Sequence, residues 1–224
     1  MSMLVYFALI LIIPLLAQWG VRSTYNKYSN VHNARGVTGS EVARYILDQN
    51  GLHHVRVEEV PGELTDHYDP RDKTVRLSTT NYHGTSIAGA SVAAHEVGHA
   101  IQDATDYSPL RVRHALVPVA NLGSSLSWIF ILVGLVLNSL QLTLIGVIFF
   151  AAAVLFQIVT LPVEFNASHR ALAQMQSFNL LGPNEMGGSK KVLTAAAMTY
   201  VAATLVAVAQ LMHFILAFLG QGDD

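Results

Sequence analysis

The chain has 224 residues, of which 52% are hydrophobic and 12% are charged, and its formal net charge is −2. The charged share is about half that of an average soluble domain, which argues for a membrane protein, and the net charge gives no sign of a nucleic-acid partner. Cysteine is absent, which excludes disulfides and thiolate ligands, so a metal must be held by Asp, Glu and the ten histidines.

Four apolar stretches are long enough to cross a bilayer as helices. They cover residues 3–21, 116–137, 142–162 and 192–219, and the short polar turn at 138–141 makes a tight helical hairpin of the middle two. A cleaved signal peptide is the alternative for the first stretch. No Lys or Arg precedes that stretch and no small-x-small cleavage site follows it, so we expect four transmembrane helices.

The cations predict the orientation of these helices. All 13 Lys and Arg lie either between the first two spans or between the last two. The positive-inside rule therefore places both connecting segments in the cytoplasm and both termini outside. We expect a multi-pass protein of the bacterial plasma membrane whose only certain partner is the lipid bilayer, with an oligomeric state that the sequence does not predict.

The first cytoplasmic segment, residues 22–115, predicts alternating helices and strands. A capping box at Thr38–Glu41 starts a helix that stops at Gly51. Residues 53–60 alternate and are rich in valine, as in a strand, and a turn at 69–72 joins two hairpin arms, LTDHY and KTVRLS. A helix follows over 86–104.

The remaining boundaries follow from the same patterns. The hairpin of spans covers 116–162, and the segment 163–191 continues the third span as a helix that ends at Gly182-Pro183. The first span (1–21) and the last (192–224, with a short outside tail) complete the chain. We expect a mainly α membrane protein with four transmembrane helices and a cytoplasmic α+β portion that carries a small β-sheet.

The motif His95-Glu96-Val97-Gly98-His99 lies in the helix over 86–104. Residues four apart share one face of a helix, so His95 and His99 can present two imidazoles to one zinc ion. Glu96 is then placed to take a proton from the attacking water. The alternative is a chance match with two ordinary surface histidines, which the helical context disfavours.

A catalytic zinc usually has three protein ligands. Asp103 shares the helix face of His99 but is too close along the helix to complete a tetrahedron easily. Glu164 follows Pro162 at the cytoplasmic end of the third span, where a carboxylate is costly unless it is paired or coordinated; an ordinary glutamate at the water interface is the alternative. The candidates for the third ligand are His67, His83, Asp103, His114, Glu164 and His169.

Three separated motifs, HEVGHAIQ, LPVEFNASHRALA and LTDHYDPRDKTVRLS, resemble the YugP-type membrane zinc metallopeptidases. STYNKYS and KVLTAAAMTYVAA extend the resemblance over nearly the whole chain. The chain is more distantly similar to the HtpX and CAAX prenyl protease families, in which the Glu of a downstream E-x-x-x-D motif is the third zinc ligand. The resemblance implies His95, His99 and Glu164 as ligands, in the gluzincin arrangement, and Glu96 as general base.

The chain departs from the distant families at Ser168, where those families have Asp. A zinc-bound histidine normally donates its second N–H to an oxygen acceptor, and Asn166 or Ser168 could accept it. A hydrolase also needs a donor for the oxyanion. The candidates are His169, Arg170, Tyr107 and Tyr82; Arg170 is preferred because it is always charged, and its alternative role is a positive anchor at the lipid surface.

These patterns predict a zinc-dependent endopeptidase that acts at the cytoplasmic face of the membrane. The cytoplasmic α+β portion is then expected to be a zincin-like metallopeptidase. Unfolded or extended polypeptides are the expected substrates, because zinc peptidases bind main chain beside a sheet edge, here LTDHY or KTVRLS. The rivals are an intramembrane protease, a zinc-stabilised scaffold without turnover, and a CAAX-type protease. Glu96 argues against the scaffold, since a structural zinc needs no neighbouring base and fills its fourth position with protein.

Overall fold

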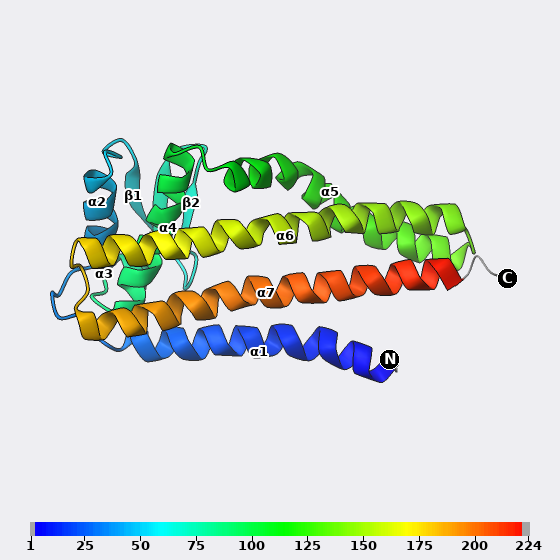
Figure 1. Cartoon of the computed structure of the whole chain (residues 1–224), viewed down its shortest axis with the longest axis horizontal. Helices are drawn as coiled ribbons and strands as arrows, with labels where there is room; N and C mark the ends of the chain where they lie inside the picture. Colours follow the sequence, from blue (N-terminus) through cyan, green and yellow to red (C-terminus); the bar gives the residue numbers. More distant parts are fainter. Residues whose placement is uncertain (1–2, 221–224) are drawn as a thin grey trace. The chain divides into compact units, whose positions relative to one another are not determined.

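The computed structural model describes residues Met3 to Gly220 and is mostly helical (Figure 1). The chain forms two units: a sheet unit of residues 16–107 and 163–199, and a helical unit whose described residues are 3–15, 108–162 and 200–220. The elements in chain order are α1 (Met3–Ser29), α2 (Gly39–Gln49), β1 (Arg56–Val60), β2 (His67–Asp69), β3 (Thr74–Ser78), α3 (Thr79–His83), α4 (Ile87–Ala104), α5 (Ser108–Val136), α6 (Leu140–Ser177) and α7 (Pro183–Gly220).

Four helices of the described chain, α1, α5, α6 and α7, are long and apolar enough to cross a membrane, as the sequence predicts. Each helix extends beyond the apolar stretch that it contains. The helix α5 begins at Ser108 and α7 begins at Pro183. Proline suits the first position of a helix, because the N–H that it lacks would have no partner within the helix. The apolar stretches are therefore parts of longer helices that also carry polar residues.

The helical unit contains the predicted hairpin of α5 and α6. The turn between them is short because Asn138 adopts a left-handed φ of 51°, which asparagine tolerates. A Cβ on Gly134 would lie 2.4 Å from Thr143 Oγ1, so the two helices approach more closely than a larger side chain allows. Trp128 packs edge-on against Phe150 and Phe214, with ring centroids 6.2 and 5.9 Å apart.

The sheet unit contains a three-stranded sheet in the order β1-β3-β2. The predicted hairpin is present as antiparallel β2 and β3, and β1 pairs parallel to β3. The predicted strand at 53–60 is shorter than expected, since β1 covers Arg56–Val60. The expectation that KTVRLS could be a free edge is wrong: β3 lies in the centre, where Val75 and Leu77 are completely buried, so β1 and β2 are the edges.

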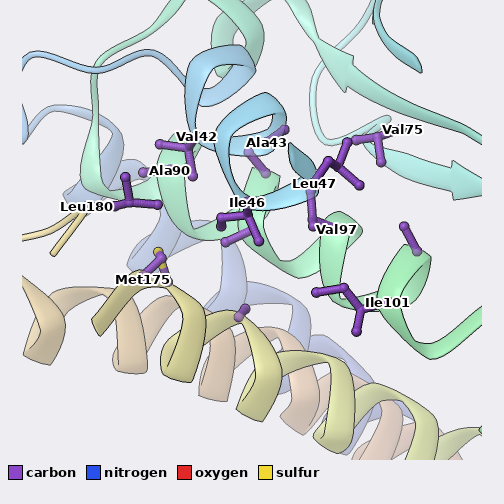
Figure 2. Close-up of a cluster of buried hydrophobic side chains, with 14 of the residues drawn as sticks. Val42, Ala43, Ile46, Leu47, Val75, Ala90, Val97, Ile101, Met175 and Leu180 are labelled. Carbon is purple, nitrogen blue, oxygen red and sulfur yellow. The ribbon is translucent and has the colours of Figure 1, made fainter. Parts of the chain in front are cut away.

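The core of the sheet unit lies between α2, α4, the sheet and the last turns of α6. The predicted capping box starts α2: Glu41 N donates to Thr38 Oγ1 and Thr38 N donates to Glu41 Oε2. The helix then buries Val42, Ile46 and Leu47 against α4 (Figure 2). Further core side chains come from β3, α4, α6 and the loop after α6: Val75, Ala90, Val97, Ile101, Met175 and Leu180.

The end of α6 differs from the prediction. The helix stops at Ser177 rather than at Gly182-Pro183, because Asn179 adopts a left-handed φ of 51° that no α-helix continues. Leu180 N then donates to Met175 O at 2.9 Å, and the Leu180 side chain returns into the core. The hydrogen bond and the buried Leu180 side chain hold the C-terminal end of α6 in the core that it shares with α4.

Candidate metal centre

The helix α4 carries the histidine motif on a buried surface. Its N-cap is Ser86, whose hydroxyl accepts from Gly89 N, and its many alanines favour the helix while letting neighbours approach closely. His95 and His99 lie one turn apart, with ring centroids 4.8 Å apart and ring planes at 86°. Their side chains keep 15% and 11% of their surface exposed, enough for a ligand to reach them.

The helix α6 brings Glu164 to both imidazoles. Glu164 Oε2 lies 3.3 Å from His95 Nε2 and 3.6 Å from His99 Nε2, and its side chain is only 3% exposed. One ligand atom from each of the three residues lies within 4.8 Å of the other two. Two nitrogens and one carboxylate oxygen in this arrangement match the donor set of a catalytic zinc, which leaves a fourth position for water or substrate.

The approach of α6 to α4 depends on Gly98. A Cβ at this position would lie 2.6 Å from Ala167 O, well inside the contact distance, so any larger residue must push the helices apart. Ala167 is three residues after Glu164, so this contact and the ligand lie on neighbouring turns of α6. The glycine in the motif therefore allows the packing that places Glu164 beside the two histidines.

Gln102 fixes which nitrogen of His99 carries the hydrogen. Gln102 Nε2 donates to Val163 O at 2.8 Å and to Asn166 Oδ1 at 3.0 Å. Because a main-chain carbonyl only accepts, the amide nitrogen must face Val163 and Oε1 must face His99 Nδ1, 3.0 Å away. His99 Nδ1 is then a donor, and its Nε2 offers a lone pair toward Glu164 and a metal.

Ser168 plays the corresponding part for His95. Its Oγ lies 3.2 Å from His95 Nδ1, while His95 Nε2 faces Glu164. With Nε2 turned toward the metal position, Nδ1 carries the hydrogen and donates it to the serine hydroxyl. Ser168 stands where the distant families have Asp, and a neutral acceptor thus occupies that position here.

Glu96 is buried beside the group of His95, His99 and Glu164. Burial raises the pKa of its carboxyl to about 7, the nearby carboxylates of Glu164 and Asp66 add to this, and the His95 ring and a hydrogen bond from the Tyr68 main chain oppose it. A carboxyl group with a pKa close to neutrality can both take and return a proton under ordinary conditions. Tyr68 belongs to the edge strand β2, so this hydrogen bond also joins Glu96 to the sheet.

The other candidates for the third ligand do not belong to the group of His95, His99 and Glu164. Asp103 accepts instead from Tyr68 Oη at 2.7 Å and pairs with Lys73 at 2.5 Å. The remaining candidates have other surroundings: His67 Nδ1 lies 2.8 Å from Thr65 O, His83 Nε2 lies 3.0 Å from Glu59 Oε2, His169 is exposed, and His114 belongs to the helical unit.

The predicted oxyanion donor, Arg170, is connected to the centre through Asn166. Its Nε donates to Asn166 Oδ1 at 2.8 Å, and its guanidinium lies 5.9 Å from the Tyr107 ring centroid. Asn166 also accepts from Gln102, so a chain of hydrogen bonds runs from Arg170 to His99. Asn166 does not touch a metal histidine directly, although the sequence suggests it as an acceptor.

Gln102 is the residue that sequence reasoning misses. It lies three residues after His99 on the same helix and therefore on a neighbouring part of its face. A glutamine in a buried, alanine-rich helix is a signal that its amide has fixed partners, and Gln102 is completely buried. The sequence contains the spacing H-x-x-Q, but the orientation of the Gln102 amide depends on Val163 O, which is brought close only by the fold.

Comparisons with known proteins show the family of the chain. The family described as "Putative neutral zinc metallopeptidase" matches residues 3–219. The chain is also 50% identical over 208 residues to the "Putative membrane protease YugP" of Bacillus subtilis (strain 168), which covers 93% of this chain and 92% of that protein. No solved structure matches the chain.

Gly98→Ala is expected to weaken metal binding, because the new Cβ would push Ala167, and with it Glu164, away from α4. Overpacking of this kind costs about 1–3 kcal/mol of stability, so the midpoint of thermal unfolding in detergent should fall as well. Zinc content after dialysis measures the first effect. Gly20→Ala is the control, since a Cβ at Gly20 meets nothing within 4 Å; wild-type zinc content in Gly98→Ala would contradict the prediction.

Gln102→Leu is expected to lower the affinity for zinc by about 10–100-fold, because His99 loses the acceptor that fixes its ring. Competition with a chromogenic chelator measures the affinity of the purified protein. Gln176→Leu makes the same chemical change on the exposed side of α6 and should leave the affinity unchanged. Equal affinities of the two variants would show that Gln102 does not position His99.

Proposed function

Because the chain belongs to the "Putative neutral zinc metallopeptidase" family, we propose that it is a zinc-dependent endopeptidase of the cell membrane. The membership confirms the resemblance expected from the sequence motifs, and it supports a protease role for a membrane protein. Zinc is the cofactor, given the family and the buried group of His95, His99 and Glu164. The observation that carries the proposal is Glu96, a buried carboxyl group directly beside that group.

The proposed chemistry is hydrolysis of a peptide bond by water. Zinc, when bound by the three ligands, supplies a Lewis acid that polarises the scissile carbonyl and makes water more acidic. Glu96 takes the proton of the attacking water and returns it to the leaving amine. His99 and His95 keep their Nε2 atoms free for the metal, because Gln102 and Ser168 accept from the opposite nitrogens. The ligand set makes this a gluzincin type of site.

Arg170 is the proposed donor to the oxyanion. Its Nε is used by Asn166, but both η nitrogens keep N–H groups for another acceptor. The Tyr107 ring and the bond to Asn166 restrict the guanidinium, which lowers the cost of holding it in place during the reaction. A permanently charged donor would stabilise the negative charge that develops on the carbonyl oxygen.

An extended polypeptide is the proposed substrate, bound along the edge strand β2. Strand β2 has β3 on one side only, so its other edge is open within the sheet, and β2 also contacts α4. The bond from Tyr68 to Glu96 supports this placement, since it puts the proposed base beside the same strand. Main-chain recognition favours unfolded segments over a particular sequence.

We further propose that the centre faces the cytoplasm and that both termini lie outside. The support is the distribution of charge along the sequence: all 13 Lys and Arg lie in the segments that connect α1 to α5 and α6 to α7, or in the adjoining ends of these helices. The α5–α6 turn carries no positive charge and is expected outside.

Glu96→Gln is expected to reduce cleavage of casein by about 10²–10⁴-fold, because the amide cannot take the proton. The variant should keep its zinc, since the three ligands remain. Wild type, wild type with chelator, and the variant are compared by gel in detergent. Glu164→Ala is expected to lose both zinc and cleavage.

Glu63→Gln is the matched control, because it makes the same change at an exposed position and should cut like wild type. Cleavage by Glu96→Gln at the wild-type rate would eliminate the proposed mechanism. If wild type and Glu96→Gln both hold zinc and neither cuts any of several unfolded proteins, a non-catalytic scaffold becomes the better explanation.

The absence of cysteine makes the orientation directly testable. Gln141→Cys in the α5–α6 turn and His54→Cys in the sheet unit each introduce one exposed thiol. A membrane-impermeant maleimide added to intact cells should label Gln141→Cys and leave His54→Cys unlabelled until the cells are opened. The reverse pattern would invert the proposed orientation.

A further inference from the structure

An open pocket with a volume of ≈ 700 Å³ lies between α1 and α7 in the sheet unit, outside the metal centre. Lys27 comes from α1, and Lys190 and Lys191 come from α7. Thr24 and Thr194 line the same space. We refer to it as the lysine pocket. Its volume is in the range of small-molecule and headgroup sites.

The three lysines of the pocket have no carboxylate partner among the described residues. All three are exposed, and none makes an ion pair with another of the residues that the structure describes. Lys27 Nζ lies 5.6 Å from the centroid of the Tyr28 ring. By contrast, five cations of the same unit pair with carboxylates: Arg44, Arg56, Arg71, Lys73 and Arg76. Like charges gathered without a counter-charge attract an anion.

The pocket is built by the packing of α7. A Cβ on Gly188 would lie 2.7 Å from Tyr28 Cε1, so the tyrosine ring lies directly against the helix backbone. The neighbouring Ser189 is completely buried and accepts from Ser91 Oγ of α4 at 2.7 Å. With Ser189 fixed against α4, the adjacent Lys190 is held on an exposed part of α7, where it lines the pocket together with residues of α1.

The position of the pocket along both helices identifies the kind of anion. On α1, Lys27 follows the apolar stretch that ends near Val21, and on α7 the apolar stretch starts at Val192, directly after Lys191. Both helices are long and apolar enough to cross a membrane. Basic residues at this point along such helices meet the phosphate layer of the bilayer. The lysine stems and the Tyr28 ring supply apolar surface beside the charges.

We propose that the lysine pocket binds the phosphate group of an anionic membrane lipid. The ammonium groups of Lys27, Lys190 and Lys191 surround the phosphate, and the threonine hydroxyls donate to its oxygens. This differs from general attraction to a charged membrane, because the charges converge from two helices on one hollow. The binding is independent of peptide hydrolysis.

The test measures lipid retained by the purified full-length protein in detergent, by native mass spectrometry. Phosphatidylglycerol is the anionic probe, and phosphatidylcholine carries the same phosphate without net charge. Wild type is expected to retain phosphatidylglycerol over phosphatidylcholine. Lys190→Gln/Lys191→Gln should bind phosphatidylglycerol about tenfold more weakly, with unchanged zinc content as evidence of folding.

The control is Arg22→Gln/Arg35→Gln, which removes the same charge from exposed positions outside the pocket and should bind phosphatidylglycerol like wild type. An equal loss in this control would overturn the proposal in favour of general attraction, and so would equal retention of the two lipids. Inorganic phosphate is the third arm and is expected not to displace the lipid. Displacement of phosphatidylglycerol by inorganic phosphate at the same concentration would exclude a lipid as the occupant.

Discussion

A carboxylate that is almost completely removed from water, Glu164, is the constraint on which the metal centre depends. A buried charge of this kind is tolerated only when partners compensate for its lost hydration. Two imidazoles lie within 3.6 Å of its oxygen, and a divalent cation between the three groups would compensate for it fully. Removing either histidine would leave the buried charge of Glu164 with less compensation, so the three residues stabilise one another.

The surrounding packing serves this set by bringing two helices together. Gly98 allows α4 to approach the backbone of α6, and Gln102 then joins the helices by bonding to Val163 O and to Asn166. Each imidazole receives its acceptor from a different helix, since Gln102 belongs to α4 and Ser168 to α6. Moving either helix would therefore disturb both the ligand geometry and the hydrogen bonds that orient the histidines.

Sequence reasoning succeeds here wherever a feature is local. The helix period alone places His95 beside His99, and the capping box at Thr38 and the hairpin around Asp69 each involve residues that are neighbours in the chain. The four apolar stretches are equally local, because a bilayer requires an unbroken apolar run. Glu164 could be proposed because a carboxylate at the end of an apolar stretch is costly.

What the sequence does not predict depends on contacts between distant segments. The central place of β3 follows from its pairing with β1, which the chain order of the strands does not specify. The early end of α6 rests on one asparagine with a left-handed φ, a conformation that asparagine adopts in only some contexts. The role of Gln102 requires Val163 O, which is 61 residues away.

The helix α4 links the metal centre and the lysine pocket without making one part of the other. His95 turns toward α6, whereas Ser91, one turn earlier, bonds to Ser189 of α7, next to Lys190. In these two contacts α4 meets different partners, α6 at His95 and α7 at Ser91. A lipid phosphate held by Lys27, Lys190 and Lys191 would add stability to the packing of α1 against α7, while the candidate metal centre is formed by α4 and α6. An enzyme arranged in this way can use the bilayer for its stability and keep its metal chemistry independent of the lipid that is bound.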